Sequence, residues 1–475
     1  MKLNCFKDIF DHQAKNVNFA AFILAITSFI SAILGFLRER LLAGRFGAGD
    51  EIDIYYAAFR IPDFISTVLI IGAIAAAITP VFSQYLVRSR REAFEFLSNL
   101  LNVFLISLVV ICGILIVFTP QLLPLIAPGF SGEKRELTIL LTRIMLFSPL
   151  LLGISNIISA ILRVFRRFFI SSLSPIMYNL GIIFGILFFV PQFGLQGLAW
   201  GVVLGGFLHL LIQIPIFFSI GFKPEKILNF NHHGLKEVIR LTIPRSIGLA
   251  AAQINLIVIT AIASTLVKGS ISILNWADAL SRPLVTFIAI SYSTAAFPAL
   301  SLAFSKDDKK KFNQIYSLTF DKIILFLLPL SFLFFIFREL IVKIILQVGK
   351  FTPINASLTA ACLGMFCLGL FAQGLINLIA KAFYAIHDTK TPAIASVIGM
   401  VLNLIFCLLF VRLFSFQNPF QQFFINFLNL QDLKEVQVIG LPLAISLSAI
   451  FQFFILFVLF QKKIHGHHSS TIKPS

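Results

Sequence analysis

The sequence predicts an all-α, polytopic integral membrane protein with about 12 transmembrane helices, arranged as two pseudo-symmetric six-helix halves around a central cavity. Of its 475 residues, 58% are hydrophobic and only 12% are charged, which excludes an ordinary soluble protein. Apolar runs of about 20 residues or more recur along the chain, each long enough to cross a bilayer core of roughly 30 Å as a helix. No run alternates polar and apolar residues as the strands of an outer-membrane barrel do.

Polar turns and turns rich in glycine and proline separate the predicted spans. The spans cover residues 18–43, 54–86, 97–127, 136–162, 172–191, 195–221, 236–266, 270–302, 318–347, 354–385, 391–414 and 437–461. Residues 416–436 are expected to form a long external loop before the last span. The segment 1–16 is polar and lacks the apolar core and cleavage site of a secretory signal, so we expect it on the cytoplasmic surface.

Basic residues gather in alternate loops, chiefly at 88–91, 163–167, 223–236 and 306–311. Because Lys and Arg are retained on the cytoplasmic side of a membrane, we expect these loops and both termini to be cytoplasmic. The same distribution accounts for the net charge of +17. The excess of positive charge therefore indicates membrane topology, and we expect no nucleic-acid partner.

The second half of the chain repeats features of the first. Span two ends around Pro80 and span eight around Pro298, 218 residues later; Pro175 and Pro392 follow spans four and ten at a similar offset. The repeat predicts two halves, 1–222 and 223–475, related by parallel topology. Such halves place a substrate site at their interface and move about it in alternating access.

Charged residues interrupt the apolar sequence between Gly35 and Pro80. An ionised side chain at membrane depth costs at least a few kcal/mol, so it usually faces a cavity, a partner charge or a polar substrate. Arg38 offers a planar fork that matches phosphate oxygens, although it could instead extend to the outer interface or pair with Glu39 or Asp53. Asp53 could hold Arg38, close an external gate, accept a bond from a sugar hydroxyl, or cap a helix start.

Two further pairs are candidates for the cavity. Arg60 and Asp63 are three residues apart on one helical face, so either an internal pair or a ligand role is open. Asp278 and Arg282 have the favourable i, i+4 order for an ion pair, and Pro283 predicts a kink in the same helix. We predict Arg38, Asp53, Arg60, Asp278 and Arg282 as the substrate-binding residues.

The remaining titratable residues give no sign of catalysis or metal binding. The five Cys residues have no metal-ligand spacing and are expected to be small buried hydrophobes. His209 lies alone on an apolar span, and we expect it to be a hydrogen-bonded core residue rather than a proton relay. Arg143 could line the cavity. No nucleotide-binding P-loop is present, so no cofactor is expected.

Several runs of residues resemble the MurJ/MviN family, the flippases for lipid-linked peptidoglycan precursor within the multidrug/oligosaccharidyl-lipid/polysaccharide exporter superfamily. They are Leu34–Glu39, Phe46–Gly49 with Asp53, Ala58–Pro62, Gln253–Asn255, Gly349–Thr352, Phe383–Ala385 and Asp388–Pro392. Arg38 matches the family's cavity arginine near the end of span one. Asp53 matches its acidic residue at the start of span two.

Other positions depart from the family pattern. Ala32 stands where a second family arginine is expected, Ser66-Thr67 where a basic pair is expected, and Ala279 where the Arg of an Asp-Arg pair is expected. Arg282, one turn further on, could restore the charge that is missing at Ala279. The two C-terminal helices thought to form a groove for the polyprenyl tail are expected to be missing.

The resemblance implies a lipid II flippase of the bacterial cytoplasmic membrane. Such a protein would move a polyprenyl-pyrophosphate-linked saccharide by alternating access, as a monomer among membrane lipids, coupled to an ion gradient or to the membrane potential. The alternative is a flippase or exporter for another lipid-linked oligosaccharide or a drug-like small molecule. A membrane enzyme is disfavoured, because it would need a His/Asp or paired-acid constellation near an interface.

Overall fold

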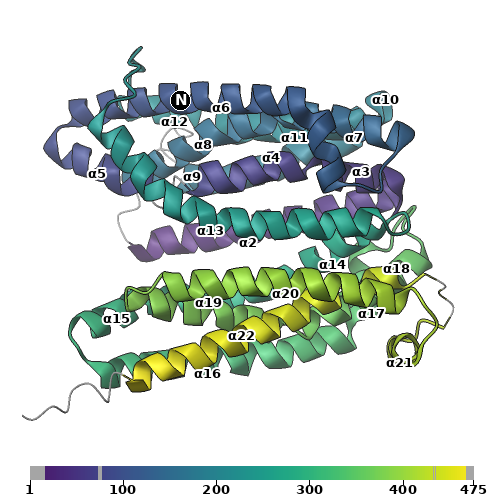
Figure 1. The fold of residues 1–475 in the computed structure, drawn as a ribbon. Helices are drawn as coiled ribbons and strands as arrows, with labels where there is room; N and C mark the ends of the chain where they lie inside the picture. The colour runs from purple at the N-terminus through teal and green to yellow at the C-terminus, as the bar shows by residue number, and fades with distance from the viewer. Residues whose placement is uncertain (1–16, 73–76, 432, 434, 467–475) are drawn as a thin grey trace, which may run out of the picture. The chain divides into compact units, whose positions relative to one another are not determined.

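A computed structural model describes residues 17–72, 77–431, 433 and 435–466. The expected surface segment 1–16 lies outside these residues. Every regular element in the described ranges is a helix, which confirms the predicted fold class (Figure 1). The helices divide into two compact units, residues 1–46 with 50–257 and residues 47–49 with 258–475. The halves 1–222 and 223–475 stay a prediction.

The first unit contains the helices of the first six predicted spans and most of the seventh. They are α2 (Val17–Phe46), α3 (Asp50–Ala58), α4 (Arg60–Ile65), η1 (Ser66–Ile71), α5 (Thr79–Arg88), α6 (Arg90–Ile126), α7 (Gly132–Met145), α8 (Phe147–Val164), α9 (Phe168–Phe184), η3 (Gly185–Phe189), α10 (Val190–Phe193), α11 (Leu195–Leu211), α12 (Ile214–Ser219) and α13 (His233–Ser264). Residues of α13 from 258 onward belong to the second unit.

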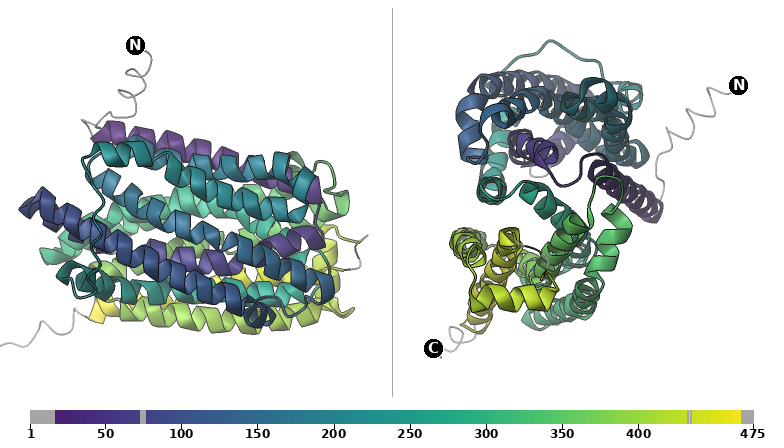
Figure 2. Two further views of the ribbon diagram at one scale, coloured as in Figure 1. Left: turned by 90° about the horizontal axis from the view of Figure 1, so that it is seen from above. Right: turned by 90° about the vertical axis from the view of Figure 1, so that its right-hand side faces the viewer.

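The second unit continues with the helices of the later spans, drawn in green and yellow in Figure 2. They are α14 (Ser270–Leu284), η4 (Val285–Ile290), α15 (Ser291–Ser305), α16 (Lys309–Ile336), α17 (Arg338–Leu346), α18 (Pro353–Cys367), α19 (Leu370–Ala385), α20 (Lys390–Phe414), α21 (Pro419–Leu428), η5 (Gln437–Ile439) and α22 (Gly440–Gly466).

Ten helices of the described residues are long and apolar enough to cross a membrane, or eleven if the bent pair α18 and α19 is one span. The axes of α18 and α19 differ by 41°. Helix α2 is not among these, although its 30 residues correspond to about 45 Å of helix. The structure thus confirms a multi-span membrane protein, while the count of twelve stays a prediction.

One predicted loop is wrong. Within 416–436, residues Pro419–Leu428 form α21. The Asn418 side chain accepts a hydrogen bond from the Gln421 N–H at 2.8 Å, and Asn429 ends the helix in a left-handed conformation with φ of 57°. The N-terminus is therefore capped by a side chain, and the C-terminus ends at Asn429, a residue type that tolerates the left-handed conformation.

Helices α9 and α11 meet through small residues, which fixes α9 in the first unit. A Cβ atom on Gly181 would lie 2.3 Å from the Gly205 Cα, and one on Gly185 would lie 2.4 Å from the Gly201 Cα. Only glycine permits such an approach of two helix backbones, and small residues at four-residue spacing produce it in membrane helices. Helix α9 also packs along α2, which carries Arg38.

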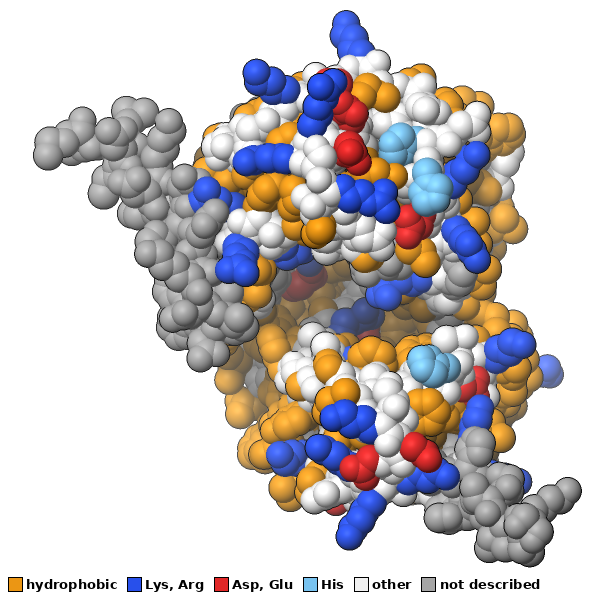
Figure 3. Space-filling model, turned by 90° about the vertical axis from the view of Figure 1, so that its left-hand side faces the viewer, with side chains coloured by type: hydrophobic (Ala, Val, Ile, Leu, Met, Phe, Trp, Pro, Cys, Tyr) orange, Lys and Arg blue, Asp and Glu red, His pale blue; other side chains and the backbone are white. Residues whose placement is uncertain are grey.

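Lys and Arg side chains gather over one end of each unit (Figure 3). Exposed basic residues include Arg88 at the end of α5, Arg91 in the first turn of α6, and Lys309–Lys311 at the start of α16. They belong to the alternate loops that the sequence predicts to be cytoplasmic. The side of the membrane on which this end lies stays a prediction.

Candidate functional site

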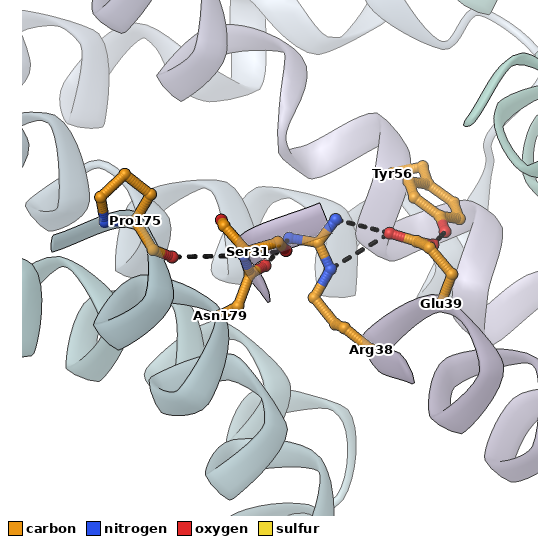
Figure 4. A network of polar contacts seen from close by, with 6 residues as sticks. All are labelled: Ser31, Arg38, Glu39, Tyr56, Pro175 and Asn179. Atoms are coloured by element: carbon orange, nitrogen blue, oxygen red, sulfur yellow. Dashed lines mark hydrogen bonds and ion pairs between the residues drawn. The ribbon is translucent and has the colours of Figure 1, made fainter. Parts of the chain in front are cut away.

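Arg38 lies in α2 and is held by partners from two helices (Figure 4). Its Nε and Nη2 atoms donate to Glu39 Oε1 at 3.1 and 2.6 Å. Its Nη1 atom donates to Asn179 Oδ1 of α9 at 3.1 Å. The internal pair with Glu39, one of the predicted alternatives for Arg38, is therefore present.

Glu39 and Asn179 are themselves oriented by further hydrogen bonds. The Tyr56 hydroxyl in α3 donates to Glu39 Oε2 at 2.6 Å. The Asn179 amide donates to the Ser31 carbonyl and hydroxyl oxygens, both at 3.3 Å, and to the Pro175 carbonyl at 3.2 Å. Because its N–H groups face these acceptors, Asn179 presents its carbonyl oxygen to Arg38. We call Arg38, Glu39, Tyr56 and Asn179 the Arg38 cluster.

The Arg38 cluster is suited to binding an anion. The Arg38 side chain is 25% exposed and that of Glu39 is 10% exposed, so the Arg38 side chain is only partly covered. Its hydrogen bonds within the described residues use three of the five guanidinium N–H groups. Two N–H groups of a permanently charged, planar fork can therefore turn to phosphate or carboxylate oxygens.

The other predicted residues of the first unit lie on the short helices that follow α2. Asp53 is 2% exposed and belongs to the first turn of α3, where a negative charge is favourable. In the same turn, Asp50 forms an ion pair with Lys134 of α7, with Lys134 Nζ 2.6 Å from Asp50 Oδ1. Arg60 and Asp63 are half-buried on α4. The substrate roles of Asp53 and Arg60 stay predictions.

In the second unit, Asp278 and Arg282 form the expected i, i+4 ion pair on α14, with Arg282 Nε 3.1 Å from Asp278 Oδ2. The side chains are 60% exposed for Arg282 and 32% for Asp278. Pro283 follows directly, and the backbone changes to the π-helix η4 two residues later. Their substrate roles also stay predictions.

Neutral hydrogen bonds form around Ser66-Thr67, where the resemblance leads us to expect a basic pair. Thr67, in the π-helix η1, accepts a hydrogen bond from Gln253 Nε2 of α13 at 2.9 Å. Ser246 Oγ of the same helix donates to the Val68 carbonyl at 2.8 Å. This contact between η1 and α13 within the first unit therefore needs no basic pair at Ser66-Thr67.

Three other polar residues have structural partners in the first unit. His209 is buried, with its Nδ1 2.6 Å from Ser155 Oγ, which confirms the prediction of a hydrogen-bonded core residue. Gln213 Nε2 donates to the same Ser155 oxygen at 2.6 Å. Arg143 Nε donates to the Ile116 carbonyl at 3.0 Å.

Among the described residues, no group of three or more His, Cys, Asp or Glu side chains could hold a metal ion.

Sequence reasoning missed three members of the Arg38 cluster as site residues. Glu39 had a signal, since an acid beside a membrane arginine is a natural counter-charge. Asn179 had none, because 141 residues separate it from Arg38. Tyr56 could be suspected only from its place on the short helix after α2.

A family model described as "Lipid II flippase MurJ" matches residues 42–475. A "Probable lipid II flippase MurJ" of Buchnera aphidicola subsp. Acyrthosiphon pisum is 30% identical over 450 residues, which cover 93% of this chain and 83% of the relative. The "Lipid II flippase MurJ" of Burkholderia cenocepacia is 27% identical over 381 residues, which cover 78% of this chain and 74% of the relative.

Solved structures agree with these relatives. A structure described as lipid II flippase MurJ in an inward closed conformation has a TM-score of 0.75 and 25% identity, covering 96% of this chain and 94% of that one. An inward-facing multidrug resistance MATE family transporter of the MOP superfamily has a TM-score of 0.73 at 14% identity, covering 95% of this chain and 99% of that one, which shows the shared fold alone. The family match over residues 42–475, with a relative 30% identical over 93% of the chain, shows that the chain belongs to the MurJ family of lipid II flippases.

Proposed function

We propose that this chain flips lipid II, the polyprenyl-pyrophosphate-linked peptidoglycan precursor, across the bacterial cytoplasmic membrane by alternating access. The Arg38 cluster is the observation that supports this proposal, because it offers a partly exposed arginine side chain within a member of a flippase family. Family membership also favours a transporter over an enzyme.

The pyrophosphate of the cargo is the chemical group that Arg38 suits. A pyrophosphate leaving the headgroup region needs a counter-charge, and a guanidinium supplies it in a bidentate geometry. Without cargo, Glu39 neutralises Arg38, so that no lone ion remains in a membrane span. With cargo, the two N–H groups not used by the cluster bind phosphate oxygens, while Asn179 keeps the guanidinium in place.

The other predicted residues take supporting roles. Asp53 carries the wrong charge to bind phosphate. We assign it one of two roles: it accepts a hydrogen bond from a sugar hydroxyl of the cargo, or it positions basic neighbours. Arg60 supplies a further positive charge after α3. In the second unit, Arg282, with Asp278 as its counter-ion, is the candidate for a second anionic contact.

The transport cycle uses the repeat in the sequence. The halves 1–222 and 223–475 alternate access to the bound cargo, with both termini in the cytoplasm and the chain acting as a monomer. The sequence contains no nucleotide-binding P-loop, so an ion gradient or the membrane potential supplies the energy.

Complementation of a conditional strain that lacks its own lipid II flippase tests the proposal. Wild type and Arg38→Ala are compared with Arg91→Ala, a matched control that removes an arginine whose side chain is 87% exposed and paired with Glu95. We expect rescue by wild type and Arg91→Ala but not by Arg38→Ala at equal membrane levels. Rescue by Arg38→Ala would refute the role of the Arg38 cluster. Failure of well-expressed wild type would indicate another lipid-linked oligosaccharide or a drug-like cargo.

A further inference from the structure

Helix α21 connects α20 and α22, and it runs across the spans rather than along them. Figure 1 shows it end-on beside long helices that are seen from the side. Its ten residues, PFQQFFINFL, include no charged side chain. A short helix that lies across the ends of membrane spans, with aromatic residues and no charge, has the features of a segment at a membrane surface.

One face of α21 packs on its own unit. Phe420 stacks on Phe410 of α20, with ring centroids 5.8 Å apart and ring planes within 3° of parallel. Phe424 contacts Phe414 at 5.5 Å, and Gln421 Nε2 donates to the Phe414 carbonyl at 2.9 Å. This face fixes how the helix is turned about its axis.

A second face carries Gln422 and Asn426, which are four residues apart and both exposed. The third face carries Phe423 and Phe427, also four residues apart, with 61% and 49% of their surface exposed. The two phenyl rings stack on each other with centroids 5.8 Å apart. A polar and an aromatic stripe thus lie side by side on the surface that the protein leaves uncovered.

The aromatic stripe is continuous with the surface of a membrane span. Phe427 contacts Phe335 of α16 at 5.6 Å, and the span Lys309–Ile336 ends one residue after Phe335. Phe416, in the turn before α21, is 59% exposed. The exposed rings therefore lie at the level where α16 leaves the apolar layer.

We infer that α21 is an interfacial helix, which inserts Phe416, Phe423 and Phe427 into the boundary between lipid headgroups and acyl chains. Gln422 and Asn426 face water. Since α21 carries no charge, burial of apolar surface holds it there rather than attraction to anionic lipids. In the proposed orientation this is the outer leaflet, and α21 ties the ends of α16 and α20 to it. The inference does not depend on the nature of the cargo.

The C-terminal segment of the chain does not suit this face. It follows the opposite end of α22, whose 27 residues correspond to about 40 Å of helix. A second copy of the chain would have to cover a face that borders a membrane span. Because lipid surrounds the spans of a membrane protein, lipid is the occupant that the geometry favours at this position.

Nitroxide labels on α21 test the inference in liposomes of phosphatidylethanolamine and phosphatidylglycerol. Labels replace Phe423 and Phe427 (Phe423→Cys, Phe427→Cys), with Gln422→Cys and Asn426→Cys as controls on the neighbouring stripe. The starting protein carries Cys5→Ser, and the four other cysteines are buried. Gel filtration in detergent checks that each variant is folded.

We expect labels at 423 and 427 to collide more with oxygen and less with a water-soluble nickel chelate than labels at 422 and 426. High salt should leave this difference unchanged, whereas a salt-sensitive difference would contradict insertion by apolar burial. Equal access of nickel to all four labels would overturn the inference. Labels at 423 and 427 that are immobilised and shielded from both reagents would overturn it as well, in favour of a protein partner such as a second copy.

Discussion

The glycine contact between α9 and α11 makes a quantitative prediction for Gly181→Ala. The new Cβ atom would lie 2.3 Å from the Gly205 Cα and 2.4 Å from the Gly205 nitrogen, whereas ordinary contact begins at 3.4 Å. Both close atoms belong to the backbone of α11, so no side chain can move aside. The two helices must separate along the whole contact.

Separating well-packed elements to admit extra carbon typically costs about 1–3 kcal/mol. Alanine also gains up to about 1 kcal/mol over glycine as a helix former, which offsets part of this cost. Gly113→Ala on α6 is the matched control, because a Cβ atom there has no neighbour within 4 Å. The difference in stability between the two variants therefore isolates the clash, at about 1–3 kcal/mol.

Thermal unfolding in detergent, followed by fluorescence-detected gel filtration, measures this difference. We expect Gly181→Ala to unfold at a lower temperature than wild type, and Gly113→Ala at the same or a higher one. Gly181 lies two residues from Asn179, so complementation should also weaken as Asn179 moves relative to Arg38. If Gly181→Ala matched Gly113→Ala in stability, the close approach of α9 and α11 would be refuted.

Three further predictions concern charged residues. Arg38→Lys keeps the positive charge but loses the planar fork of the guanidinium. We expect the loss of about one charge-assisted hydrogen bond, roughly 1.5–3 kcal/mol, and therefore weak complementation. Full activity of Arg38→Lys would show that charge alone suffices. Asp278→Asn removes the charge that pairs with Arg282 on an exposed surface, so the free energy of unfolding should fall by only about 0.3–0.5 kcal/mol. A large loss of transport at unchanged thermal stability would indicate that Asp278 contacts the substrate. Burial alone would raise the pKa of Asp388, but bonds from Lys463 and from Thr391 lower it to about 2 from 3.8. The ionised Asp388 carboxylate should therefore stabilise the protein fully above pH 3.8, and this stabilisation should be lost as the pH falls toward about 2. At pH 7 we expect Asp388→Asn to unfold at a lower temperature than wild type, and near pH 2 we expect the two proteins to unfold at the same temperature. A difference in unfolding temperature that persists near pH 2 would contradict the prediction.

Features with a local cause could be predicted from the sequence. The spans follow from apolar runs that no soluble fold would tolerate, and the Asp278–Arg282 pair follows from helical spacing alone. Helix α21 was predicted as part of a loop because its ten residues are too short for a span. Its caps were nevertheless visible as Asn418 before Pro419 and as Asn429 at the end.

The Arg38 cluster shows where local reasoning ends. The fork of Arg38 and the neighbouring Glu39 could be read from adjacent residues. Which of many polar residues would meet the guanidinium depends on how α9 packs along α2. Glycines fix α9 against α11, and α9 in turn packs along α2. This arrangement brings Asn179 Oδ1 to 3.1 Å from the Nη1 atom of Arg38, which is 141 positions away in the sequence.

The repeat between the halves extends from sequence pattern to backbone irregularity. In span two, Pro62 is followed by the π-helix Ser66–Ile71; in span eight, Pro283 is followed by the π-helix Val285–Ile290. A hydrophobic repeat alone would need no such breaks, since regular helices bury the same stripes. A π-helical turn costs hydrogen-bond geometry and is found mainly where function retains it. Its presence shortly after a proline in both span two and span eight therefore supports the repeat of the two halves, which stays a prediction.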